Sequence, residues 1–121
     1  MTLKAKWPQA SGRNLTLQVT GILAPGDDLK GQLFSISDLA RPEMKGLKIE
    51  SVLFALQEKM GLLLWWDEGT SDLILPLESR GFFSFVYPIH CPKDWPGTVW
   101  WTAFKVDEPK HFYFTMECEP L

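Results

Sequence analysis

Alternation of apolar and polar residues is the feature that most restricts how this chain can fold. In residues 15–20 and again in residues 111–119, every second side chain is apolar and those between are polar or amphipathic. Successive side chains of a β-strand point to opposite faces, so this period of two predicts strands with one buried and one solvent-facing side.

Other short apolar segments are separated by clusters of Gly, Pro and Asp. They cover residues 32–37, 62–66, 73–77, 82–87 and 98–106. Together with the alternating segments they predict about seven to eight strands with turns between them, which is typical of an all-β antiparallel sandwich, and a jelly-roll-like arrangement is one form of it.

Residues 43–60 fit two different structures. Apolar residues recur at helical spacing from Ile49 to Met60, and Gly61 could cap such a helix. The same stretch can also be divided into the two faces of a strand. Periodicity alone favours the helix slightly.

Length and charge exclude several classes of protein. The chain has 121 residues, which suits one domain, and its 12 Lys and Arg against 15 Asp and Glu give a net charge of −3. We therefore expect no nucleic-acid partner, because such binding draws on a basic surface. We also expect no membrane partner, because the longest apolar run, residues 62–66, is far shorter than a membrane span. Two cysteines and no apolar leader predict a soluble protein of a reducing compartment.

The sequence contains few candidate catalytic or metal-ligating residues, and their spacing fits no known catalytic or metal-binding motif. There is no Gly-x-Ser-x-Gly motif, and the four nitrogen or sulfur side chains lack the spacing of a zinc site; they are His90, Cys91, His111 and Cys118. The carboxylates of residues 67–72 fit turn chemistry better than a calcium site. A carboxylate pair suited to sugar hydrolysis stays open, since that depends on spatial separation. We predict no enzyme activity, no metal and no cofactor.

Tryptophan is unusually frequent for a chain of this size, with six residues. Two adjacent pairs are Trp65-Trp66 and Trp100-Trp101. On a strand, one member of each pair faces the core and the other faces outward. Outward indoles can stack on sugars or anchor a protein interface.

Residues 1–12 are predicted to form an N-terminal arm ahead of a sandwich domain over residues 13–121. The arm carries Lys4, Lys6 and Trp7, and Pro8 and Gly12 disfavour regular structure within it. Such a segment is either frayed or docked on a partner through its aromatic residue.

The order of segments carries a resemblance to a known family. Alternating residues 15–19 come first, then residues 47–52, the run 62–67 with its Thr-Ser-Asp turn, residues 73–77, and residues 81–85 before a closing strand. This order resembles small β-sandwich virion proteins of tailed bacteriophages, which are structural or capsid-decorating. The resemblance implies a strand at residues 46–57, which we adopt. The proline-rich loop at residues 88–97 departs from the pattern.

The resemblance implies a non-enzymatic capsid decoration or cement protein. Its expected partners are the major capsid protein and further copies of itself, with a homotrimer preferred, and its expected location is the capsid surface of virions assembled in the host cytoplasm. The partner-binding residues expected from charge and aromatic content are Lys4, Lys6, Trp7, Arg13, Trp95, Trp100 and Trp101. The alternative function is a carbohydrate-binding or receptor-recognition module that uses the Trp65/Trp66 or Trp100/Trp101 pair.

Overall fold

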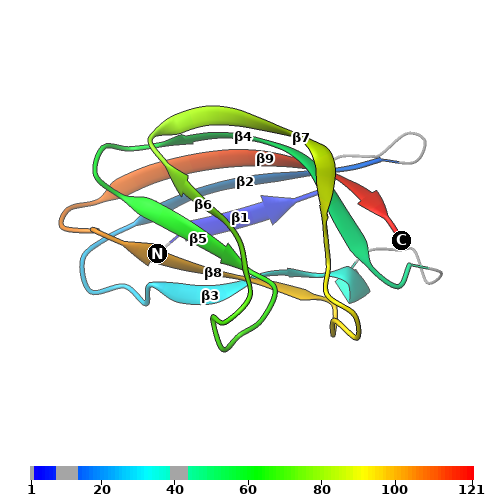
Figure 1. Cartoon of the computed structure of the whole chain (residues 1–121). Helices are drawn as coiled ribbons and strands as arrows, with labels where there is room; N and C mark the ends of the chain where they lie inside the picture. Colours follow the sequence, from blue (N-terminus) through cyan, green and yellow to red (C-terminus); the bar gives the residue numbers. More distant parts are fainter. Residues whose placement is uncertain (1, 8–13, 39–43) are drawn as a thin grey trace.

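Two antiparallel β-sheets face each other in the computed structural model, which describes residues 2–7, 14–38 and 44–121 (Figure 1). Over these residues the strands are β1 (Thr2–Lys6), β2 (Leu15–Leu23), β3 (Lys30–Ser35), β4 (Leu47–Leu56), β5 (Gly61–Trp65), β6 (Leu73–Glu78), β7 (Arg80–His90), β8 (Thr98–Phe104) and β9 (Lys110–Pro120). A short 3-10 helix, η1 (Ile36–Asp38), follows β3.

The two sheets confirm the predicted all-β sandwich. Sheet A has the order β1-β2-β9-β4-β7 and sheet B the order β3-β8-β5-β6. The described residues form nine strands, whereas we expected seven to eight, and the additional strand is β1. Its five residues pair in continuous register with β2, so this part of the predicted arm is an edge strand. Trp7 follows this strand, and the rest of the predicted arm, residues 1 and 8–12, lies outside the described residues.

The ambiguous stretch is a strand, as the resemblance implied. β4 lies between β9 and β7 in sheet A and pairs with both. Its side chains alternate between the interior and the outer face on either side of an irregularity between Ile49 and Ser51, so that Ile49, Val52 and Phe54 are all buried. The helical spacing of its apolar residues does not decide the structure, because two neighbouring strands satisfy its backbone and the sandwich buries one face.

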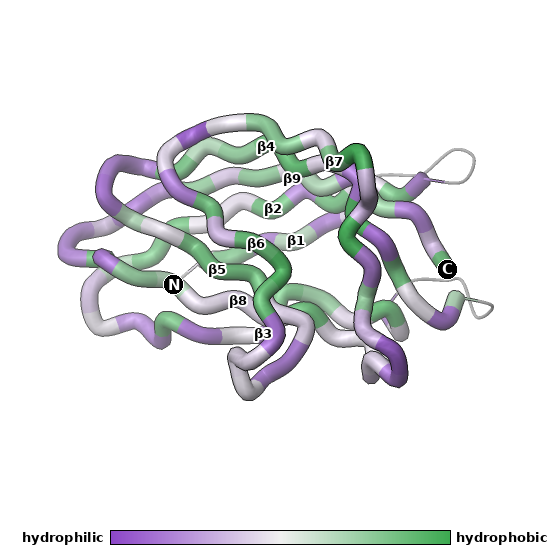
Figure 2. Tube along the Cα trace, viewed as in Figure 1, coloured by the Kyte–Doolittle hydropathy of each residue, from purple (hydrophilic) through white to green (hydrophobic). Residues whose placement is uncertain are grey.

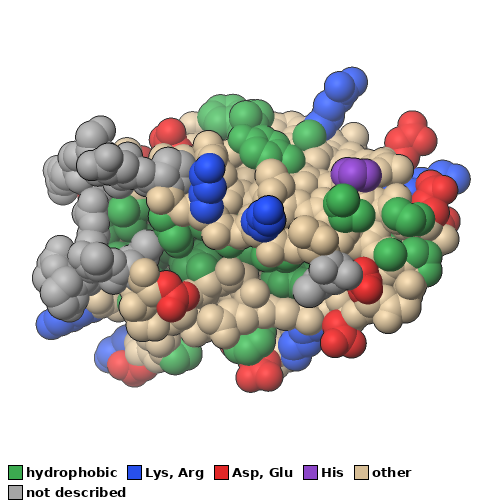
Figure 3. Space-filling view, turned by 180° about the vertical axis from the view of Figure 1, so that it is seen from behind, with side chains coloured by type: hydrophobic (Ala, Val, Ile, Leu, Met, Phe, Trp, Pro, Cys, Tyr) green, Lys and Arg blue, Asp and Glu red, His purple; other side chains and the backbone are tan. Residues whose placement is uncertain are grey.

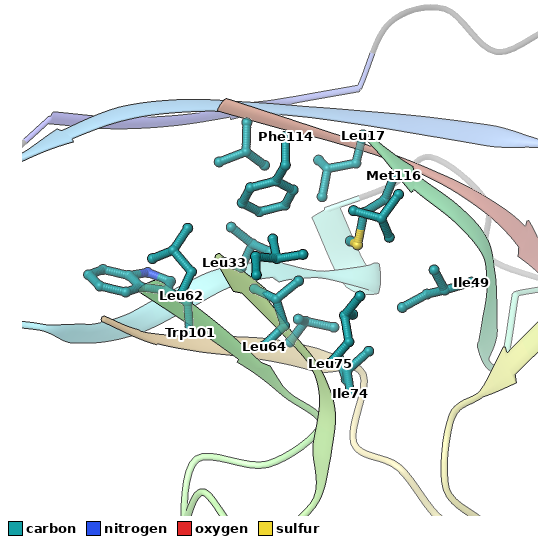
Figure 4. Packing of buried hydrophobic residues seen from close by; sticks show 14 of the residues in the cluster. Leu17, Leu33, Ile49, Leu62, Leu64, Ile74, Leu75, Trp101, Phe114 and Met116 are labelled. Carbon is teal, nitrogen blue, oxygen red and sulfur yellow. The ribbon is translucent and has the colours of Figure 1, made fainter. Parts of the chain in front are cut away.

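The core is the layer between the sheets. Figure 4 shows Phe114, Leu17 and Met116 of sheet A pointing toward Leu64 and Trp101 of sheet B. Figure 2 shows why one face of each sheet is buried: hydrophobic and hydrophilic residues succeed one another along several strands, and the turns are mostly hydrophilic. The fold is therefore stabilised mainly by the apolar area that the two sheets remove from water when they pack face to face.

Glycines inside the strands receive aromatic rings from the neighbouring strand. Gly21 pairs with Phe112, and a Cβ atom at Gly21 would lie 2.3 Å from Cζ of that ring. Gly61 pairs with Phe104 in the same way, with 2.1 Å to Cζ. Two further cross-strand pairs of this kind are Gly31 with Trp101 and Gly81 with Phe54. The missing side chain of each glycine therefore leaves the space that the neighbouring ring occupies, so these glycines have a packing role within the strands.

Candidate interaction surfaces

The outer face of sheet A carries a shallow groove that runs across the strands. Register places Lys4, Thr20, Tyr113, Ala55 and Arg80 in one row from β1 to β7. The next row is Lys6, Gln18, Thr115, Leu53 and Phe82. Two hollows of about 700 and 440 Å³ lie along the first row and share Ala55 and Tyr113. Leu53 and Phe82 of the second row line the smaller hollow, whereas Lys6, Gln18 and Thr115 lie beside the hollows. We call this surface, completed by Ile22 and His111, the sheet A groove.

The charge of the groove is basic. Lys4 and Lys6 lie at its β1 end and Arg80 at its β7 end, and neither row contains a carboxylate. Figure 3, which views the molecule from behind, shows basic and hydrophobic side chains over the middle of that side and acidic ones mainly toward its rim. The groove therefore combines an apolar floor with positive ends, a surface suited to an acidic protein partner.

Carboxylates gather at the other end of the same face. Glu117, Glu119 and Glu50 lie beyond the groove, and Lys48 pairs with Glu119 at 3.1 Å. A hydrogen bond with Glu119, helped by desolvation and by the repulsion of that neighbour, raises the pKa of Glu50 above its ordinary value. The outer face of sheet A is thus divided into a basic half and an acidic half.

Strand β7 carries exposed apolar side chains both in the groove, at Phe82, and beyond it, opposite Glu50. It is the last strand of sheet A, and its pairing with β4 shifts register so that residues 85–88 stand opposite Glu50 alone and form an irregular bulge. Val86 and Tyr87 in this bulge are 89% and 88% exposed, and Phe82 is 60% exposed. Large apolar side chains at an unpaired sheet edge are typical of a protein contact.

The outer face of sheet B carries one member of each tryptophan pair, as predicted. Trp65 and Trp100 stand opposite each other on β5 and β8 and are half-buried, while Trp66 and Trp101 point into the core. The indole Nε1 of Trp65 donates a hydrogen bond to Oγ1 of Thr102 at 2.9 Å.

The structure separates the predicted partner-binding residues into two groups. Lys4 and Lys6 are exposed in the sheet A groove, and Trp100 is accessible on sheet B. Trp101 is 2% exposed, and its ring fills the core beside Gly31. Trp95 is also buried, and its Nε1 donates to the carbonyl oxygens of Trp66 and Thr98 at 3.1 and 3.0 Å. Arg13 lies outside the described residues.

Trp7 is engaged by the protein's own core. Its ring packs edge-on against Phe34 of β3, with centroids 5.0 Å apart, on the side of the sandwich where β1 and β3 are the last strands. Half-buried aromatic rings in such pairs stabilise a fold. We therefore assign Trp7 first to the closure of this side of the sandwich and not to a partner.

Replacing Trp7 with alanine is expected to lower the free energy of unfolding by about 1–2 kcal/mol, because buried ring area and the pair with Phe34 are lost. Urea denaturation measures the change. Lys6→Ala, at the exposed preceding residue that ends β1, is the control and should shift stability by less than about 0.5 kcal/mol. An unchanged stability of Trp7→Ala would leave the ring free for a partner.

The candidate metal ligands of the sequence are not brought together. No group of three or more His, Cys, Asp or Glu in the described ranges is arranged to hold a metal ion. Asp67 instead caps its own loop by accepting hydrogen bonds from Oγ of Ser71 at 2.6 Å and from the backbone nitrogens of Ser71 and Asp72. These bonds, that from the Ser71 hydroxyl above all, lower the pKa of Asp67.

One buried cation is satisfied within the chain. The ammonium group of Lys110 donates to the carbonyl oxygen of Glu58 at 2.8 Å and to Oε1 of Glu108 at 3.0 Å. The hydrogen bond that Lys110 donates to Glu108 raises the pKa of Lys110 despite its desolvation. The group thus ties two turns together at one end of the sandwich.

Both thiols are free, and their reactivity should differ. Burial raises the pKa of Cys118 to about 12, with smaller effects from Glu117 and Glu50, so its reactive thiolate is scarce at neutral pH. We expect a disulfide reagent at pH 8 to leave Cys118 unmodified in the folded protein and to count both thiols in the unfolded, unreduced chain. A count of zero in the unfolded chain would show a Cys91–Cys118 disulfide and contradict the structure.

Comparisons with models of known families, with curated proteins and with solved structures give no match for this chain. Across the part of the chain that the structure describes, no helix is long and apolar enough to span a membrane. The sequence did not single out Leu53, Phe82 and Val86 as surface residues. Their apolar character was visible, but apolar residues in a predicted strand are normally assigned to the core. Leu53 and Phe82 are exposed because they lie on the outer face of sheet A, and Val86 is exposed because it lies in the bulge of the edge strand β7.

Proposed function

We propose that the protein is a non-enzymatic virion structural protein of a tailed bacteriophage, which decorates the capsid exterior and cements neighbouring shell subunits. The observation that carries this proposal is the sheet A groove together with the exposed edge of β7. A surface of this kind works by burying area across a joint, so that separating two shell subunits also breaks their contacts with the decorating protein.

The strand connections support a viral role by analogy. Apart from β1, which pairs beside β2, the strands of one sheet have the order β2-β9-β4-β7 and those of the other sheet have the order β3-β8-β5-β6. We infer from these orders a jelly-roll-like connection, an arrangement used by viral capsid and lectin domains. Because one fold serves many functions, this support is weaker than that from the surface itself.

The chemistry of the groove supports the identity of the partner. Lys4, Lys6 and Arg80 lie around an apolar floor that includes Leu53 and Phe82. An acidic patch of the major capsid protein with one or two apolar side chains fits this surface. We further propose a homotrimer, because closed three-fold symmetry matches the local three-fold points of a capsid lattice.

Substituting both Leu53 and Phe82 with serine is expected to abolish attachment to the capsid. The two side chains are 49% and 60% exposed, so the fold should survive, while loss of two central apolar contacts should weaken binding by at least about 30-fold. Cosedimentation with shells assembled from the major capsid protein of its phage measures the affinity.

Leu73→Ser provides a matched control, because Leu73 is an exposed leucine on β6 of the other sheet. This variant should bind shells as the unmodified protein does. Undiminished binding by the double variant, or an unmodified protein that never sediments with shells, would contradict the proposal. Analytical ultracentrifugation tests the trimer separately, and a chain that is monomeric both free and on shells would exclude it.

A further inference from the structure

We propose that Trp65 and Trp100 form a carbohydrate-binding platform on the outer face of sheet B, where the indole rings stack on the pyranose rings of a neutral oligosaccharide. This site lies on a different sheet from the sheet A groove. It goes beyond capsid attachment and does not depend on it.

The geometry presents one indole flat to the solvent. Trp65 stands directly opposite Trp100, on neighbouring strands that are about 4.8 Å apart. The Trp65 ring donates its Nε1 hydrogen to the Thr102 hydroxyl at 2.9 Å. A threonine hydroxyl lies close to the backbone, so an indole that reaches it must lie along the sheet and cannot stand upright. The bond also fixes the ring before any ligand arrives, which reduces the entropy lost on binding.

The side chains around the two rings suit the edges of a sugar. Gln32 follows Trp100 across the sheet, and Thr98 and Thr102 stand before and after it on the same face of β8. A pyranose ring has an apolar C–H face that packs on an indole and hydroxyl groups at its edge that need amide or hydroxyl partners. Among the residues that pair across sheet B in line with Trp100 or with Thr102, Lys30 is the single charged side chain. A neutral ligand is therefore favoured over an ionic one.

The size of the platform favours a sugar over a protein. A tryptophan side chain carries at most about 250 Å², and both rings are half-buried, so even with Leu73, which stands opposite Trp65 and is 44% exposed, they offer a few hundred Å² at most. A stable protein interface buries about 800 Å² on each partner. Two neighbouring indoles match the length of a short oligosaccharide instead.

Binding can be tested with the full chain on an array of immobilised neutral hexopyranose glycans, followed by calorimetry with the best soluble oligosaccharide. We expect binding to at least one glycan, and Trp100→Ala and Trp65→Ala should each weaken it at least tenfold. Thr102→Val should weaken it less, because this change keeps both rings but removes the bond that fixes Trp65. Circular dichroism and thermal unfolding verify that each variant is folded.

Fluorine NMR of the protein labelled with 5-fluorotryptophan locates the ligand. Only the signals of Trp65 and Trp100 should shift on titration with the oligosaccharide, and those of the buried tryptophans should not. The Leu53→Ser/Phe82→Ser variant should bind the glycan normally, which separates this proposal from that of capsid attachment. The proposal is overturned if no glycan binds, if binding survives loss of both rings, or if this face captures the capsid protein instead.

Discussion

Trp101→Ala is expected to lower the free energy of unfolding by about 3–5 kcal/mol, a large part of the stability of a domain of this size. The ring is 2% exposed and fills the core, so its removal leaves a cavity that the surrounding side chains cannot close. Its Nε1 also lies 2.9 Å from where a Cβ of Gly31 would be, so the ring packs closely on the backbone of β3. Chemical denaturation monitored by far-ultraviolet circular dichroism measures the loss.

Trp100→Ala is the matched control for this experiment. It removes the same side chain from the preceding residue of β8, but Trp100 lies on the outer face of the sheet. We expect a loss of no more than about 1 kcal/mol, since the ring is only half-buried. Equal losses for the two variants would mean that β8 does not have the observed alternation.

Gly21→Ala is expected to destabilise the protein by about 1–3 kcal/mol, although alanine is usually tolerated better than glycine within a strand. The added methyl group would lie 2.3 Å from Cζ of Phe112 and 2.8 Å from the carbonyl oxygen of Thr2, so ring and backbone must both move. Gly69→Ala is the control, because its added atom meets only Oδ2 of Asp67, at 3.3 Å.

A double-mutant cycle distinguishes the clash from a general backbone effect. Phe112→Leu alone should cost about 1–2 kcal/mol through lost packing. If the ring causes the clash, Gly21→Ala should cost far less in the Phe112→Leu background, because a smaller side chain vacates the space beside Gly21. Strictly additive losses would contradict the packing of this ring in the space that Gly21 leaves.

Much of the local structure could be predicted from the sequence. The alternation in residues 15–20 and 111–119 correctly placed Leu17, Val19 and Phe114 in the core. Each adjacent tryptophan pair divides between the two faces as expected, but only the structure decides which member is outward: Trp65 and Trp100. In residues 47–56, by contrast, the apolar spacing fitted a helix as well, and only strands on both sides resolved the ambiguity.

The candidate sites depended more on tertiary structure. Lysines at residues 4 and 6 could be identified as a basic cluster, but their position across the sheet from Leu53 and Phe82 follows from the order β1-β2-β9-β4-β7. Trp95 and Trp101 were expected at a surface because their residue type is common at interfaces, and the structure buries both.

The order of residues alone sets which side chains share a face of a regular strand, because alternation is a property of the extended backbone and is repeated every second residue. The tertiary structure decided which strands are neighbours, which strand ends a sheet and which glycine receives which ring. Those relations join residues such as Gly21 and Phe112 that lie far apart in the chain. They are set by strand order and register, which depend on how the two sheets together bury their apolar faces.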